Sequence, residues 1–321
     1  MDYTEGRELI DRAIDKAAQV GARGAFAVVG SDGALISASR MDGDEAGGMA
    51  RARSKAWITA TQQVPSTVHH DRMWKLPPPI GVGFVACSPE AAFPGAGAMP
   101  LRDRRGEIVA GFSASGSSIG PFVDLPEIDR RHLIAQGKPA NAEDLIVQWA
   151  LGLDYVGQHG DDAKRWLEAF GELPGEAGLG YSDPPAAEQP RHRWAVGLID
   201  RAFALARGRG ARVAVTICDR GGDPVQQDAM PGSATAGSIV AEALARSAAR
   251  FELPSNEVRA DLAALLPIQG AVAPGGLPLR GDAPAGAGGP GASDGGAVVG
   301  AIGVGGPDPD LCHEIAAAAL A

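Results

Sequence analysis

The sequence is short of aromatic residues, of cysteine and of long apolar runs, and each shortage excludes a class of protein. Phe, Trp and Tyr make up only 5% of the chain while hydrophobic residues make up 45%, so we expect cores built from Ala, Val, Ile and Leu. No apolar run is long enough to span a bilayer, and the N-terminal stretch lacks the apolar segment of a signal peptide. The three cysteines form no CxxC pair, which is typical of a reduced compartment. We therefore expect a cytoplasmic protein with no membrane partner.

Positive charge is scarce as well. Lys and Arg number 29 against 39 Asp and Glu, which gives a formal net charge of −10. Nucleic acids and anionic membranes are recognised by basic patches, so neither is an expected partner. The six histidines show neither the HxxxH nor the HExxH spacing of zinc-binding helices, and we predict no dedicated metal site.

The sequence does contain an internal repeat. Leu9-Ile10-Asp11-Arg12-Ala13 recurs as Leu198-Ile199-Asp200-Arg201-Ala202, and the same offset relates Pro65 to Pro254. Self-similarity that persists without a gap over this length indicates a duplicated domain.

Each copy contains the same succession of expected elements. Apolar residues recur at helical spacing over 7–20 and again over 193–207, and short β-rich runs separated by glycine turns follow. In copy 1 the predicted elements are the helix 7–20, the strands 25–29 and 35–39, the helix 47–63, the strands 81–85, 99–101 and 108–112, and the helix 143–153. The prediction is an α+β fold of two tandem α-β-β-α-β-β-β-α domains, each an antiparallel five-stranded sheet with flanking helices, which together form a pseudo-dimer.

The expected domain boundaries follow from composition. Copy 1 spans 1–158 with a proline-containing insertion at about 117–141, and copy 2 spans 191–321. A Gly/Pro-rich linker at 159–190 separates them. Residues 281–296 are low in complexity, and we expect a mobile loop there.

Several short motifs occur in the same order in both copies. Copy 1 carries Arg40-Met41-Asp42-Gly43, Lys55-Ala56, Pro65-Ser66, Gly97-Ala98-Met99-Pro100-Leu101 and the glycine-rich strand 106–116. Copy 2 carries Pro274-Gly275-Gly276-Leu277-Pro278-Leu279 and the glycine-rich strand 299–306. These motifs resemble those of the GlcG/HbpS family, which includes the C-terminal domain of PduO-type proteins. The resemblance implies a small-molecule-binding protein with haem, another tetrapyrrole or a small organic acid as ligand, and it implies a homo-oligomer.

The two copies differ in their charged residues. In copy 2 the Arg-Met-Asp-Gly stretch has become Ala229-Met230-Pro231-Gly232, and Leu244 stands where copy 1 has Lys55. Copy 1 alone therefore keeps a polar site. We expect Arg40, Asp42 and Lys55 to clamp a carboxylate and to supply an acid or base. The alternative is a salt bridge that fixes the corner between strand and helix, with Asp42 capping the helix N-terminus.

The most polar segment of copy 1 is His69-His70-Asp71-Arg72-Met73-Trp74. Adjacent histidines point to different sides, so either one alone could act as a general base or an axial haem ligand. We assign His70 to the catalytic set and His69, Arg72 and Met99 to ligand binding, while Met73 is a further axial candidate. The alternative is a solvated loop.

Small residues near the glycine-rich strands form the last candidate group. Ser113 and Ser115 could line an anion-binding nest, and Gly276 in copy 2 is a further ligand-binding candidate. The alternative is close backbone packing at a sheet end. Cys87 follows an apolar run and is expected to be a buried core thiol.

Two functions are compatible with these features. The first is a ligand-binding protein of the family type, with haem as the implied cofactor. The second is a cofactor-independent lyase, isomerase or hydrolase that acts on a small polar metabolite at the Arg/Asp/Lys site. A structural assembly subunit is a third alternative.

Overall fold

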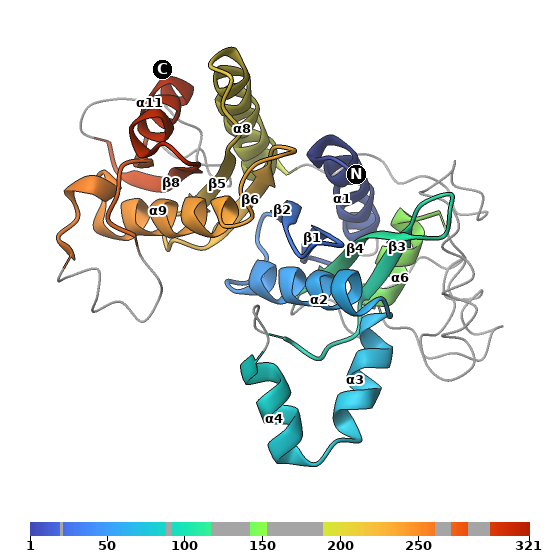
Figure 1. The fold of residues 1–321 in the computed structure, drawn as a ribbon. Helices are drawn as coiled ribbons and strands as arrows, with labels where there is room; N and C mark the ends of the chain where they lie inside the picture. Colours follow the sequence, from blue (N-terminus) through green and yellow to red (C-terminus); the bar gives the residue numbers. More distant parts are fainter. Residues whose placement is uncertain (20–21, 88–91, 117–141, 153–188, 261–270, 282–295) are drawn as a thin grey trace. The chain divides into compact units, whose positions relative to one another are not determined.

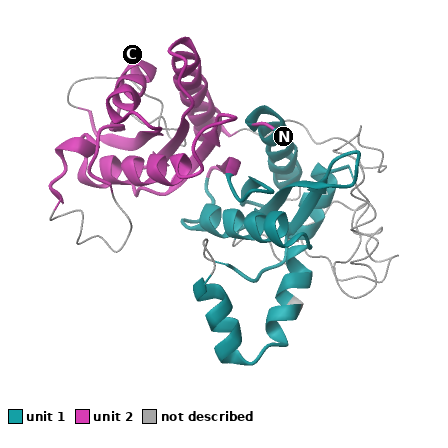
Figure 2. Cartoon of the chain, viewed as in Figure 1, with its two compact units in different colours: residues 1, 3–34, 43–188 teal, residues 2, 35–42, 189–321 magenta. Residues whose placement is uncertain are grey.

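The computed structural model describes residues 1–19, 22–87, 92–116, 142–152, 189–260, 271–281 and 296–321. The chain divides into two compact units (Figure 2). Unit 1 comprises Met1, Tyr3–Ala34 and Gly43–Glu188, and unit 2 comprises Asp2, Leu35–Asp42 and Gln189–Ala321. The segment 35–42 thus belongs by its contacts to the unit built mainly from copy 2.

Unit 1 is an antiparallel sheet with helices on both faces (Figure 1). Its strands are β1 (Ala25–Gly30), β3 (Ala98–Arg102) and β4 (Ile108–Ser115), in the order β3-β4-β1. Its helices are α1 (Tyr3–Gln19), α2 (Gly48–Gln62), α3 (Ser66–Trp74), α4 (Pro78–Cys87) and α6 (Ala142–Ala150). Helix α2 packs on one face of the sheet, and α1 and α6 contact each other on the opposite face.

Unit 2 repeats this plan with strands in the order β2-β6-β5-β8-β7, all antiparallel. The strands are β2 (Leu35–Arg40), β5 (Ala214–Asp219), β6 (Pro224–Ala229), β7 (Gly276–Arg280) and β8 (Val298–Gly305). The helices are α8 (Pro190–Gly208), α9 (Gly237–Phe251), the short 3-10 helix η1 (Ser255–Glu257) and α11 (Pro309–Leu320). The α+β class and the antiparallel pairing are as predicted.

Local sequence explains where the repeated elements begin and end. The long helix of each copy ends in a residue of left-handed conformation, Gln63 (φ 59°) and Glu252 (φ 57°), shortly before Pro65 and Pro254. Proline cannot continue the helix because it lacks an N–H. The duplicated turn glycine, Gly33 and its counterpart in copy 2, also has a positive φ, which a residue with a Cβ rarely adopts.

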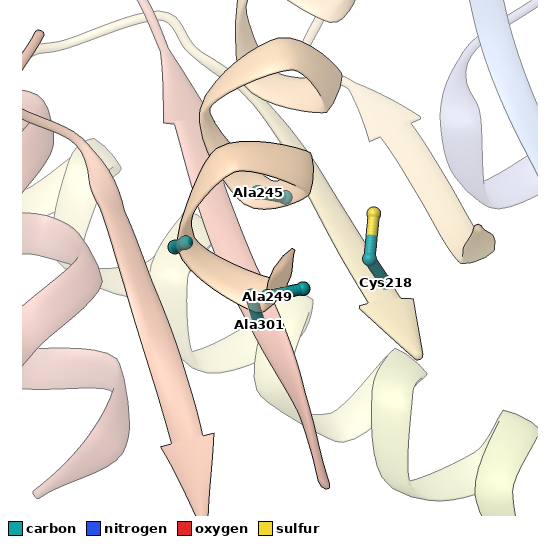
Figure 3. Close-up of a cluster of buried hydrophobic side chains, with 5 residues drawn as sticks. Cys218, Ala245, Ala249 and Ala301 are labelled. Carbon is teal, nitrogen blue, oxygen red and sulfur yellow. The ribbon is translucent and has the colours of Figure 1, made fainter. Parts of the chain in front are cut away.

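The cores are packed mainly from Ala, Val, Ile and Leu side chains, as the shortage of aromatic residues predicts. Figure 3 shows Cys218 of β5 and Ala301 of β8 against Ala245 and Ala249 of α9, in a cluster that includes Ala248. Burial raises the pKa of the Cys218 thiol well above its ordinary value.

Glycines allow the helices to approach the sheets closely. A Cβ placed on Gly111 would lie 2.2 Å from the carbonyl oxygen of Ala56, and one on Gly303 would lie 2.0 Å from that of Ala241. Both distances are shorter than any tolerable contact. The glycine-rich strands are therefore surfaces on which α2 and α9 pack.

The structure corrects two predictions and excludes one alternative. The predicted strand 81–85 lies inside helix α4, so each copy supplies four strands among its described residues and not five. Short apolar runs do not distinguish strand from helix, and proline is favoured in the first helical turn, where Pro78 and Pro79 lie. Cys87 is exposed at the end of α4 and is not a core thiol. The alternative of a solvated loop at 69–74 is excluded, because these residues belong to helix α3.

The insertion predicted at 117–141 lies outside the described residues, as does nearly all of the predicted linker 159–190 and loop 281–296. No helix in the described ranges has the length and apolar character needed to cross a membrane.

Candidate functional site

Arg40 lies at the end of β2, where it is 6% exposed. Its Nε donates a hydrogen bond to the carbonyl oxygen of Pro224 (3.0 Å), and its guanidinium forms an ion pair with Asp219. Strand β5 ends at Asp219 and strand β6 begins at Pro224, so both residues lie at the turn of the β5–β6 hairpin. The guanidinium therefore fastens β2 to this hairpin inside unit 2.

Asp42 accepts hydrogen bonds from the first backbone amides of α8. Its two carboxylate oxygens receive the N–H of Arg191 (2.9 Å) and of His192 (3.3 Å), and its own N–H donates to the side-chain oxygen of Gln189 (2.6 Å). The first turn of a helix leaves such amides without partners, and a carboxylate is a favoured acceptor for them. Asp42 thus caps α8, a helix of copy 2. The alternative considered from the sequence was that it caps the next helix along the chain, α2.

Lys55 is a buried cation of unit 1, with 1% of its surface exposed. Its Nζ donates to the carbonyl oxygen of Ala96 (2.7 Å) and to Glu143 (2.7 Å), and the other carboxylate oxygen of Glu143 accepts from the Gly116 amide (3.1 Å). The partners of Arg40 and of Asp42 therefore belong to unit 2, whereas Lys55 joins α2 to α6 within unit 1.

The small-residue candidates are enclosed in the cores. Ser113 is fully buried and donates to the carbonyl oxygen of Ala52 (2.5 Å), and Ser115 and Met99 are buried in the same sheet. In unit 2 the amide of Gly276 donates to the hydroxyl of Ser255 (2.9 Å). These contacts correspond to the close-packing alternative. Arg72, by contrast, is exposed on α3.

An apolar pocket lies between α3 and α4, inside unit 1. The two helices extend away from the sheet and are joined at their far end (Figure 1). The pocket has a volume of about 520 Å³, within the usual range for small-molecule sites. The residues that line it are His70, Met73, Trp74, Pro78, Gly81, Val82, Val85, Ala86 and Pro94.

Helix α4 is unusual because it is apolar and yet exposed. None of its residues, all of which are described, is buried, and Val82 is 69% exposed. Trp74 at the end of α3 is 83% exposed. Solvent-exposed apolar surface of this kind, gathered around a cavity, marks a binding surface.

The two histidines of α3 occupy different environments, as expected for neighbours. His70 lines the pocket and its ring stacks on Trp74, with the centroids 5.9 Å apart and an interplanar angle of 19°. His69 is 2% exposed, its ring centroid lies 5.4 Å from that of Phe84 on α4, and its Nδ1 is 2.9 Å from the side-chain oxygen of Gln62.

The remaining ring nitrogen of His69, Nε2, is buried and has no hydrogen-bond partner within the described part of the chain. Burial lowers the pKa of the His69 imidazole, and the charges of Arg72 and His70 act in the same direction. Both effects favour the neutral form of the His69 imidazole.

The pocket could not be predicted from the sequence, because the apolar run 81–85 is compatible with a strand. A usable signal was present in the repeat itself: the chain from Pro65 to Gly97 is longer than the corresponding chain from Pro254 to Gly275. Copy 1 thus has additional residues in the region that contains α4. Across the described ranges, no group of three or more His, Cys, Asp or Glu side chains is placed to hold a metal ion.

Comparison with known families gives two matches on this chain. A family described as "Haem degrading protein HbpS-like" matches residues 1–119 and residues 192–321. The tandem duplication is therefore confirmed. No curated protein matches the chain.

Solved structures resemble parts of the chain. A PduOC:haem complex is 20% identical over 40% of this chain and 90% of its own length, with a TM-score of 0.34. The Klebsiella pneumoniae protein ORFY is 18% identical over 43% of this chain and 95% of its own, also at 0.34. A double mutant of Streptomyces reticuli HbpS is 22% identical over 46% of this chain and 97% of its own, again at 0.34.

Proposed function

The chain belongs to the HbpS-like family, with one match in each copy, and from this premise we propose that it is a small-molecule-binding protein that holds haem or a related tetrapyrrole between α3 and α4 of copy 1. The observation that carries the proposal is the apolar pocket of about 520 Å³ between these helices.

The chemistry of the pocket suits a flat, apolar ligand with acidic edges. The stacked rings of His70 and Trp74 offer planar surfaces, and Val82 and Val85 offer aliphatic contacts. Each Å² of apolar surface removed from water contributes about 25 cal/mol. The exposed cation Arg72 on α3 is available to pair with carboxylates at the rim of such a ligand.

A small organic acid is the other ligand that the family resemblance implies. The pocket wall is mostly aliphatic and aromatic, and an ionised carboxylate buried against such a surface without a cation is strongly disfavoured. The pocket therefore favours the tetrapyrrole.

A cofactor-independent enzyme requires Arg40, Asp42 and Lys55 to act at one site. Each of them interacts with protein groups that fasten strands, cap a helix or join two helices. No observation favours the enzyme over the binding protein.

The test is a titration of the protein with hemin, followed by the Soret absorption band and by quenching of tryptophan fluorescence. Two variants of α4 form a matched pair: Val82 lines the pocket and Ile80 does not, although both side chains are more than half exposed. We expect Val82→Asp to weaken hemin binding by about tenfold or more because it places a carboxylate against the ligand. Ile80→Asp should bind as the wild type does. Equal affinities in all three proteins would refute the assignment of the pocket.

A further inference from the structure

We propose that Nε2 of His69 is the protein atom that binds the iron of the tetrapyrrole. The inference rests on the proposed function, because it assumes that the tetrapyrrole enters the space between α3 and α4. It assigns the iron ligand to the buried histidine and gives the pocket-lining His70 a different role.

The hydrogen bond of His69 fixes which nitrogen is available. Nδ1 lies 2.9 Å from Oε1 of Gln62, an oxygen that can only accept, so Nδ1 carries the proton. In a neutral imidazole the other nitrogen, Nε2, then holds a lone pair. Histidines that bind metals commonly donate their second N–H to a carbonyl in this way, which orients the ring and raises its basicity.

The surroundings of Nε2 give the second argument. A buried polar atom is nearly always hydrogen-bonded, and Nε2 is buried with no such partner in the described residues. His69 as a whole is 2% exposed. The lone pair of Nε2 therefore has a fixed direction and no hydrogen-bond donor among the described residues. A haem iron takes such a lone pair from its proximal histidine.

His70 is suited to a different task. It is only partly buried and lies flat against Trp74, with 19° between the two rings. A ring in that position contributes a planar wall to the pocket, against which a porphyrin can stack.

Phe84 contacts the ring of His69 from α4. Its ring is tilted at 46° to that of His69, 5.4 Å away, and it belongs to α4, no residue of which is buried. The His69 side chain thus faces the space between α3 and α4.

The experiment compares two ligands that differ in the metal alone: hemin and metal-free protoporphyrin IX. Binding of each to the full chain is measured by fluorescence quenching, and the hemin complex is also followed by its absorption spectrum. We expect His69→Ala to weaken hemin binding by about tenfold or more and to change the Soret band, while its affinity for protoporphyrin IX stays as in the wild type. Added imidazole should restore the wild-type band.

Three further variants sharpen the test. His70→Ala should keep the wild-type hemin spectrum and lower the affinity for both ligands alike, because it removes a wall. Phe84→Ala removes a ring contact of His69 and should alter the hemin spectrum less than His69→Ala does. Gln62→Leu removes the acceptor of Nδ1 and should weaken hemin by about tenfold, which keeps the proposal testable if His69→Ala does not fold.

The outcomes separate the two proposals. If the wild type binds neither ligand, the proposed function is wrong and the assignment of His69 is overturned with it. A second outcome is that both ligands bind and the hemin spectrum is unchanged in His69→Ala and Gln62→Leu, or changes only in His70→Ala. The proposed binding site between α3 and α4 is then retained, and His69 is not the iron ligand.

Discussion

Replacing Asp42 by Ala tests whether this residue stabilises the fold or belongs to a ligand site. The substitution removes both side-chain acceptors of the first α8 amides, at Arg191 and His192, and keeps the backbone N–H of residue 42 that donates to Gln189. Loss of an N-cap costs about 1 kcal/mol and up to about 2. Loss of a negative charge at a helix N-terminus adds about 0.5 kcal/mol. We expect unit 2 to lose about 2 kcal/mol of unfolding free energy.

The assay is urea denaturation of the variant beside thermal unfolding. A loss of about 2 kcal/mol corresponds to a fall of about 4–8 °C in Tm for a domain of this size. Hydrogen exchange should rise in the first turn of α8. The matched control is Asp42→Asn, since Asn is also a favoured cap and should keep most of the stability. If Asp42→Ala unfolds as the wild type does and yet loses ligand binding, the capping role is refuted and the site hypothesis gains support.

Four further predictions concern Lys55, Gly303 and two of the cysteines. Lys55→Met should lower the unfolding free energy by about 3 kcal/mol, measured by urea denaturation, because it leaves the carboxylate of Glu143 without its buried cation; a change below about 1 kcal/mol would contradict this. Gly303→Ala should unfold or severely destabilise unit 2, as seen by calorimetry, because the new Cβ meets a backbone oxygen at 2.0 Å. A thiol reagent at neutral pH should modify Cys87 in the folded protein and spare Cys312, whose pKa burial raises to about 11. The unfolded Cys312 ionises from its ordinary pKa of 9.0 and the folded one does not, so stability should fall as pH rises from 9.0 to about 11, and a Cys312→Ala variant should lose that part of the pH dependence.

The duplication and the α+β class could be predicted from the sequence because they depend on local patterns repeated at a fixed offset. Turn glycines, helix-stopping prolines and apolar periodicity act over a few residues, and Gly33, Pro65 and Pro254 behave as expected. Helix α4 was wrongly predicted because an apolar run of its length is compatible with either strand or helix.

The partners of the charged residues could not be predicted. Asp42 and the α8 amide that it caps are 149 positions apart, and Arg40 and Asp219 are 179 apart. No local pattern reports contacts across such separations. The segment 66–74 was recognised as a candidate from its histidines, but the pocket exists only because α4 is a helix that lies beside α3.

Binding of a tetrapyrrole between α3 and α4 of copy 1 can be tested by hydrogen–deuterium exchange of the full chain with and without hemin. We expect hemin to slow exchange in peptides that cover 66–87 and to change exchange little in the β5–β6 hairpin. Slower exchange in the hairpin or around Arg40, with none over 66–87, would contradict it.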